Sequence, residues 1–169
     1  IGSSHACAVH ANGALSCWGS NGSGQLGTGG SLTVDVLVPA LVPGITDAVE
    51  VAAMYNTTCV RRGVPGAYYV TCWGSNTSGQ CGIGSVAGPI TTPGAPVVGL
   101  PPDVLAFSHG FADGICVRTS DGRALCWGAN NGGYGLGVGA GGVISAPVPL
   151  PGVTEVVEVS LSTAAGCLL

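Results

Sequence analysis

The stretch that decides the fold is Cys7–Gly27, CAVHANGALSCWGSNGSGQLG, because the chain repeats it twice. The second copy, CVRRGVPGAYYVTCWGSNTSGQCG, occupies 59–82, and the third, CVRTSDGRALCWGANNGGYGLG, occupies 116–137. Each copy contains the phrase Cys-Trp-Gly, and the three tryptophans are Trp18, Trp73 and Trp127. Self-similarity at a fixed spacing of about 55 residues predicts a repeat architecture in which each repeat is one supersecondary unit.

Each repeat predicts short β-strands and no helix. Runs rich in Val, Leu and Tyr are bounded by Gly, Pro and Asn, and no window sustains an apolar period of 3.6 residues. About four short strands in each repeat are typical of a propeller blade or a β-solenoid coil. We expect one repeat domain over 1–169. Its repeats are predicted at approximately 1–44, 45–103 and 104–154, with a partial repeat at 155–169.

The cysteines of each repeat are placed to bridge a hairpin. Asn-Gly lies midway between the first two cysteines and Asp-Gly midway between those of the third repeat, whereas the second repeat has Pro-Gly there. These dipeptides favour tight turns, and facing residues of an antiparallel pair lie close to disulfide range. The predicted disulfides are Cys7–Cys17, Cys59–Cys72 and Cys116–Cys126.

Such bridges indicate an oxidising compartment, so we expect a secreted, extracellular or cell-surface protein. Two cysteines have no hairpin partner. Cys81 occupies the position of Leu26 and Leu136, which favours a buried thiol in an apolar slot. Cys167 could pair with Cys81, with another chain, or with sequence beyond this chain, so both are candidates for an extra or intermolecular disulfide.

The composition is poor in charge. Only 7% of the residues are charged, there is no lysine, and the net charge is −4. Nucleic-acid binding needs clustered Lys and Arg, and a membrane span needs about 20 mainly apolar residues, so we expect neither. A surface with few charges associates with itself, docks on a partner or carries sugar.

Three sequons offer sites for N-glycosylation, at Asn21, Asn56 and Asn76. Asn21 and Asn76 occupy the same position in successive repeats. The alternative is that these asparagines set turns by bonding to nearby backbone.

The three repeats resemble the RCC1-type β-propeller repeat, particularly its cysteine-bearing versions in secreted proteins. The Trp-Gly-x-Asn and Gly-Gln-Leu-Gly phrases at fixed spacing carry the resemblance. It implies four-stranded blades around an axis, usually seven of them. Three full periods are too few for such a ring. We therefore expect an all-β fold of about three RCC1-like blades, as an incomplete ring or an open repeat assembly.

The best-known proteins of this family include a guanine-nucleotide exchange factor and a secreted inhibitor of β-lactamases. The catalytic loop of the exchange factor has no match in this chain, so its activity is not carried over. The tryptophans of the Cys-Trp-Gly phrases are expected in the repeat core, the alternative being exposed stacking on sugars or partner side chains.

No motif predicts catalysis, a metal or a cofactor. Gly22–Gly27 matches the pattern GxGxxG, but loop and strand residues follow it where a nucleotide site needs a helix. His5, His10 and His109 lack the spacing of metal ligands. Glu50 and Glu158 fall at equivalent repeat positions, which indicates a solvent-facing strand residue and no acid–base pair.

The sequence favours an extracellular, non-enzymatic repeat protein with a structural or adhesive role. It is expected to self-associate, as a filament or oligomer, through its incomplete blade ends. The alternative is a secreted protein-binding or inhibitory module that forms one part of a seven-bladed propeller. The expected partner is a second copy or another extracellular protein, with glycans as possible ligands. An enzyme such as a lyase on a propeller scaffold is disfavoured, because no catalytic set of residues is present.

Overall fold

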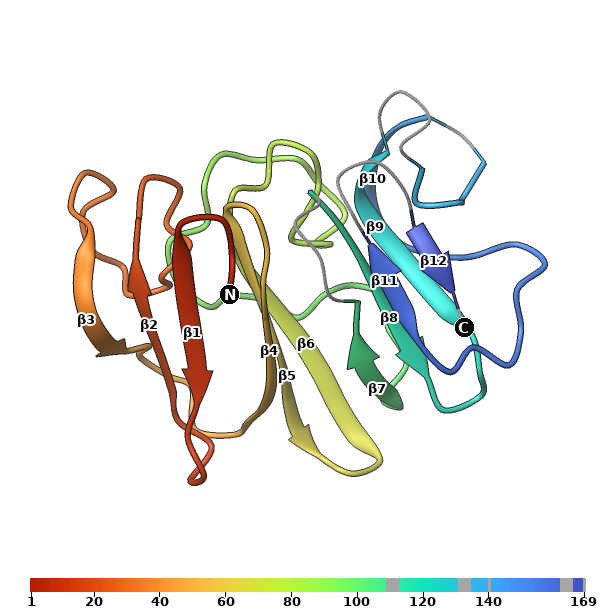
Figure 1. Ribbon diagram of the computed structural model, residues 1–169, viewed down its shortest axis with the longest axis horizontal. Coiled ribbons are helices and arrows are strands. Elements are labelled where there is room, and N and C mark those ends of the chain that lie inside the picture. Colours follow the sequence, from red (N-terminus) through yellow and green to blue (C-terminus); the bar gives the residue numbers. More distant parts are fainter. Residues whose placement is uncertain (109–112, 131–134, 140, 162–165, 169) are drawn as a thin grey trace.

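The computed structural model describes residues 1–108, 113–130, 135–139, 141–161 and 166–168 (Figure 1). These residues form antiparallel sheets that stand side by side in chain order, and none of them is helical. The all-β fold expected from the repeats is therefore confirmed. The described sheets do not close into a ring.

The strands follow one another in four sheets. The first sheet contains β1 (His5–Val9), β2 (Leu15–Gly19) and β3 (Val36–Leu41) in this order, and the second contains β4 (Ala48–Ala53), β5 (Thr57–Val64) and β6 (Ala67–Gly74). The third has the order β10 (Gly142–Pro149), β9 (Ala124–Asn130), β8 (Gly114–Thr119) and β7 (Val104–Phe107). The fourth pairs β11 (Val159–Leu161) with β12 (Gly166–Leu168).

The second sheet has three strands where the repeat predicts four. Its outer segment is reduced to two isolated bridges, Thr71 with Pro96 and Gly74 with Ile90. Prolines at 89, 93 and 96 interrupt this segment, and a proline cannot donate a hydrogen bond to a ladder. The fourth strand of the third sheet, β10, also breaks register between Ile144 and Val148, on either side of Pro147.

The disulfides bridge the hairpins at positions directly opposite each other in the register. The turn glycines Gly13, Gly66 and Gly122 all have positive φ, from 77° to 83°, which glycine adopts without steric cost. The Cα atoms of each cysteine pair lie 4.1 Å apart. The bonded pairs are Cys7–Cys17, Cys59–Cys72 and Cys116–Cys126, as the turn dipeptides predict.

The apolar core lies between sheets. One cluster joins the first sheet to the second, a larger one joins the second to the third, and another joins the third to the fourth. Each disulfide contributes to the cluster between its own sheet and the next. Full burial of a large apolar side chain contributes about 1.5–3 kcal/mol, so most of the stability of a repeat depends on its neighbour. The clusters include Leu15, Cys17, Leu26, Val60 and Trp73; Cys72, Cys81, Phe107, Ile115 and Trp127; and Cys126, Leu136, Val156, Val159 and Leu161.

Replacing both Cys116 and Cys126 by alanine should lower the melting temperature by about 5–10 °C, because the bridge restricts the unfolded chain. Differential scanning calorimetry, with and without a phosphine reductant, measures this. Cys81→Ala is the matched control: it removes a thiol without opening a bridge, so this variant should remain sensitive to reductant. A wild-type melting temperature that does not respond to reductant would contradict the assignment.

Candidate functional site

The joint between successive repeats is built around a tryptophan. Trp73 Nε1 donates a hydrogen bond to the main-chain oxygen of Gln25 in the preceding repeat, at 3.0 Å. Trp127 Nε1 donates in the same way to the oxygen of Gln80, at 2.8 Å. Both indoles are fully buried, and an unpaired buried N–H would cost about 1–3 kcal/mol. The same contact therefore locks each of these two sheets to the one before it.

A glycine two residues after each glutamine lets the indole approach. A Cβ atom on Gly27 would lie 2.5 Å from Trp73 Nε1, and one on Gly82 would lie 2.8 Å from Trp127 Nε1. Both glycines also have positive φ, 69° and 64°. The phrase Gly-Gln-x-Gly is thus a platform for the tryptophan of the next repeat.

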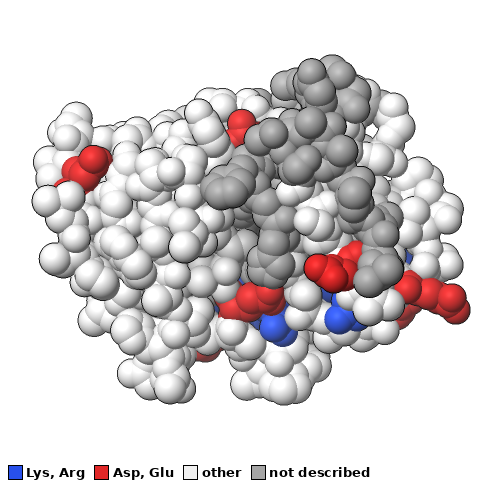
Figure 2. Space-filling view, viewed as in Figure 1, with Lys and Arg blue, Asp and Glu red and all other residues white. Residues whose placement is uncertain are grey.

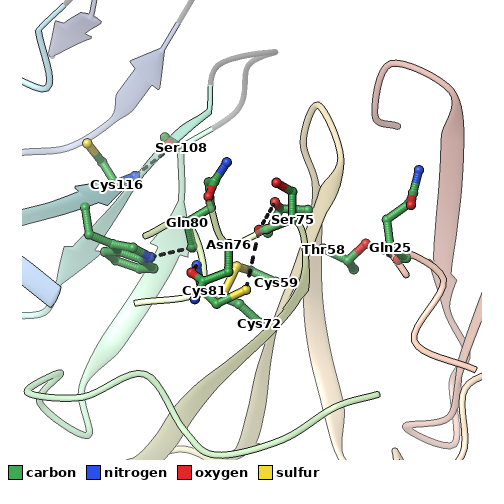
Figure 3. Close-up of a disulfide and its surroundings, with 12 residues drawn as sticks. Gln25, Thr58, Cys59, Cys72, Ser75, Asn76, Gln80, Cys81, Ser108 and Cys116 are labelled. Atoms are coloured by element: carbon green, nitrogen blue, oxygen red, sulfur yellow. Dashed lines mark hydrogen bonds between the residues drawn. A yellow bond between two sulfur atoms is a disulfide. The ribbon is translucent and has the colours of Figure 1, made fainter. Parts of the chain in front are cut away.

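An asparagine holds this platform loop in shape. Asn21 Oδ1 accepts from the N–H of Leu26 at 3.1 Å, and its Nδ2 donates to the oxygen of Ser31 at 3.1 Å. Asn76 repeats both contacts with Cys81 and Ser85. In Figure 3, Asn76 lies beside Gln80 and Cys81, next to the Cys59–Cys72 disulfide. The asparagine therefore closes the loop that carries the platform.

These contacts favour the alternative for Asn21 and Asn76, in which the side chain shapes its own loop, over N-glycosylation. Their side chains are buried, with exposed fractions of 2% and 0%, and each Nδ2 already donates a hydrogen bond. A sugar on that nitrogen is incompatible with the folded loop. Asn56 differs, because it is only half-buried. Glycosylation at Asn56 stays a prediction.

Trp18 differs from the two tryptophans that follow it. It is half-buried, whereas Trp73 and Trp127 are fully buried. Among the described residues, no platform loop meets its indole. The structure places the second and third tryptophans in the core. A core role for Trp18 stays a prediction.

A buried histidine strengthens the joint between the first two sheets. His5 Nε2 lies 2.8 Å from Thr58 Oγ1, and that hydroxyl donates to the oxygen of Gln25 at 2.7 Å. Because the single hydroxyl proton is used, His5 Nε2 must be the donor to Thr58. Burial, and secondarily the positive amino terminus, lowers the pKa of His5 from 6.5 to about 4. The histidine is therefore neutral and serves the fold.

Within the described residues, the remaining candidates are not brought together as a catalytic or metal site. His10 is exposed and bonds Ser16, and His109 lies outside the described residues. The described part of the chain contains no group of three His, Cys, Asp or Glu side chains placed to hold a metal. The loop Gly22–Gly27 leads to β3 and meets no helix. In the same described part, no helix is long and apolar enough to span a membrane.

Cys81 is a buried free thiol. Burial raises its pKa to about 12, and its Sγ lies 3.7 Å from the oxygen of Ser75. A nucleophilic cysteine needs a thiolate, so Cys81 is inert. Within the described residues it forms no disulfide, and an intermolecular bridge at this residue stays a prediction. The side chain of Cys167 lies outside the described residues, although its backbone pairs with Ser160.

Comparison with known proteins identifies related sequences and folds. Residues 1–25 match the family model described as the regulator of chromosome condensation (RCC1) repeat. The yeast RCC1 (Prp20) structure with Kap60 bound is 18% identical and covers 99% of this chain and 40% of that chain, with a TM-score of 0.79. Human WBSCR16 is 17% identical and covers 99% of this chain and 43% of that chain, with a TM-score of 0.81.

A third similar structure is the CRINKLY WD40 ectodomain of the Arabidopsis thaliana receptor kinase ACR4. It is 20% identical and covers 99% of this chain and 47% of that chain, with a TM-score of 0.58. This chain thus spans less than half the length of each of the three proteins. At these identities the likeness shows the fold, and it confirms the RCC1-like repeats expected from the Cys-Trp-Gly phrases.

The tryptophan joint predicts unequal effects of one substitution at two equivalent positions. Trp73→Phe should lower the free energy of unfolding by about 1–3 kcal/mol, because it leaves the oxygen of Gln25 without its indole donor. Trp18→Phe is the matched control and should cost less than about 0.5 kcal/mol, as is usual where no such contact is lost. Urea unfolding followed by circular dichroism measures both. Equal losses would show that the indole hydrogen bond does not stabilise the joint.

His5 predicts a loss of stability in mild acid. Its pKa is lower in the folded state than in the unfolded state, so its stabilising contribution is complete above pH 6.5 and is lost as the pH falls towards 4. The loss amounts to about 3 kcal/mol over that window. Melting temperatures between pH 7 and 4.5 should fall for the wild type and for His10→Gln, but much less for His5→Gln. Parallel pH profiles for all three proteins would contradict this role of His5.

Proposed function

We propose that this RCC1-like repeat chain is an extracellular, non-enzymatic protein-interaction module. The observation that carries the proposal is a surface that is poor in charge and exposes apolar side chains. Only 7% of the residues are charged, and Leu37, Val38 and Leu41 on strand β3 are exposed. A surface of this kind fits a protein partner.

Three buried hairpin disulfides support a location outside the reducing cytosol. The ACR4 structure is, by its description, the ectodomain of a receptor kinase, which supports the same location for a similar fold. The yeast RCC1 structure was solved with a protein, Kap60, bound, which supports protein recognition as the role of such a scaffold. Neither likeness supplies the identity of a partner for this chain.

Self-association into larger assemblies is a second candidate, and strand β3 favours it. Leu37, Val38 and Leu41 are exposed by 88%, 69% and 65%, and β3 is the free outer edge of its sheet. The corresponding outer strand of the third sheet, β10, is mostly half-buried. An exposed apolar edge strand can pair with another chain. Few charged side chains oppose such contacts, because most of the face in Figure 2 is uncharged.

Light scattering after size-exclusion chromatography, over a concentration series, tests self-association. The purified chain should form dimers or larger species, which electron microscopy can image. Leu37→Glu should shift the population towards the monomer if the β3 edge drives association. Val64→Glu is the matched control, because Val64 is 63% exposed on the β5–β6 hairpin, away from this edge.

Assembly that is sensitive to Leu37→Glu and insensitive to Val64→Glu supports the edge strand. A chain that stays monomeric at the highest soluble concentration would overturn self-association. Melting temperatures of the variants show that each substitution leaves the fold intact.

A further inference from the structure

A carboxylate bridges the second and third sheets. Glu50 Oε2 accepts from Arg61 Nε at 3.1 Å, and Glu50 Oε1 accepts from the N–H of Phe107 on β7, at 3.3 Å. Hydrogen bonds between charged groups are roughly twice as strong as neutral ones. The Glu50 carboxylate therefore accepts hydrogen bonds from an arginine of its own sheet and from a main-chain N–H of the next sheet. This geometry corrects the expectation that Glu50 faces solvent.

The third sheet has the same arginine but lacks the carboxylate. Ala106 is paired with Arg118 in the register of β7 and β8, as Glu50 is paired with Arg61 in that of β4 and β5. The methyl group of Ala106 cannot accept a hydrogen bond. Arg118 Nε is buried and, within the described residues, has no hydrogen-bond partner. A buried donor without a partner is costly, so this N–H is available to a ligand.

A cavity of about 280 Å³ lies where the carboxylate is missing. Glu158 is exposed at its rim and forms no ion pair with Arg118 within the described residues. Glu158 and Val159 occupy the same positions in their repeat as Ala106 and Phe107 do in the preceding one. The cavity therefore lies between equivalent segments of successive repeats. On the face in Figure 2, the basic side chains lie in the lower part of the view, each beside acidic ones. The lining residues are Ala106, Phe107, Arg118, Val157, Glu158 and Val159.

We propose that this cavity binds a single carboxylate group against Arg118, in the position that the Glu50 side chain occupies between the second and third sheets. An arginine guanidinium matches a carboxylate in shape and hydrogen bonding. The apolar lining suits the carbon stem of an organic acid or of an acidic side chain. Glu158 at the rim repels further negative charge, so the site disfavours dianions such as phosphate. The proposal does not depend on association through strand β3.

Arginine Nε–H NMR signals test this site directly, because the chain has only four arginines and no lysine. Acetate, titrated at constant ionic strength, should shift the Arg118 signal saturably and leave Arg123 in place. Arg123 is exposed and already paired with Asp121. Phosphate should shift Arg118 less than acetate does. A capped peptide with one aspartate, titrated in parallel, distinguishes an acidic side chain from a free acid by which of the two binds more tightly.

Two variants make the result decisive. Ala106→Glu supplies the missing carboxylate from within the chain, so the response to acetate should disappear and the melting temperature should rise. Arg118→Gln should weaken acetate binding about tenfold or more, and Arg123→Gln should leave it unchanged. The proposal is overturned if Arg118 does not respond to acetate or the peptide, if phosphate shifts it equally, or if Ala106→Glu still responds to acetate.

Discussion

The hydrogen bond from a tryptophan indole to a main-chain oxygen of the preceding repeat is the contact on which the rest of the structure depends. Each sheet has only two to four short strands and no core of its own, so its apolar face must be covered by a neighbour. The indole of Trp73 or Trp127 fixes the distance and orientation at which that neighbour packs. The indole approaches the platform loop so closely that only glycine fits at Gly27 and Gly82. An asparagine in each loop holds the loop in the shape that the indole contacts.

The disulfides act within this arrangement and do not replace it. Each one closes a hairpin whose cysteines belong to the apolar cluster shared with the next sheet. A covalent bond in the hairpin therefore keeps the surface of the joint in register. The chain has few charges with which to stabilise its surface, and two of its ion pairs, Arg61–Glu50 and Arg62–Asp47, lie on the second sheet. Where the third sheet lacks the first of these pairs, a cavity remains.

A place where a contact of the repeat is broken is a candidate for binding. Arg118 keeps the cationic half of a bridge in which Ala106 stands where the preceding repeat has the carboxylate of Glu50. This difference is visible only against the complete bridge of Glu50 and Arg61. A complete contact in one repeat therefore shows which chemical group would complete the same contact in another repeat.

The sequence by itself determined the repeats, their β structure and the cysteine pairs, because turn residues and spacing are local properties of the chain. Only the tertiary structure decided the roles of residues in contact with another repeat. Asn21 and Asn76 match a glycosylation sequon, yet their amides are buried by loop closure. Gln25 matters through its main-chain oxygen, which no side-chain pattern reveals. Burial and long-range pairing depend on how the sheets pack, and that packing is not contained in any single repeat.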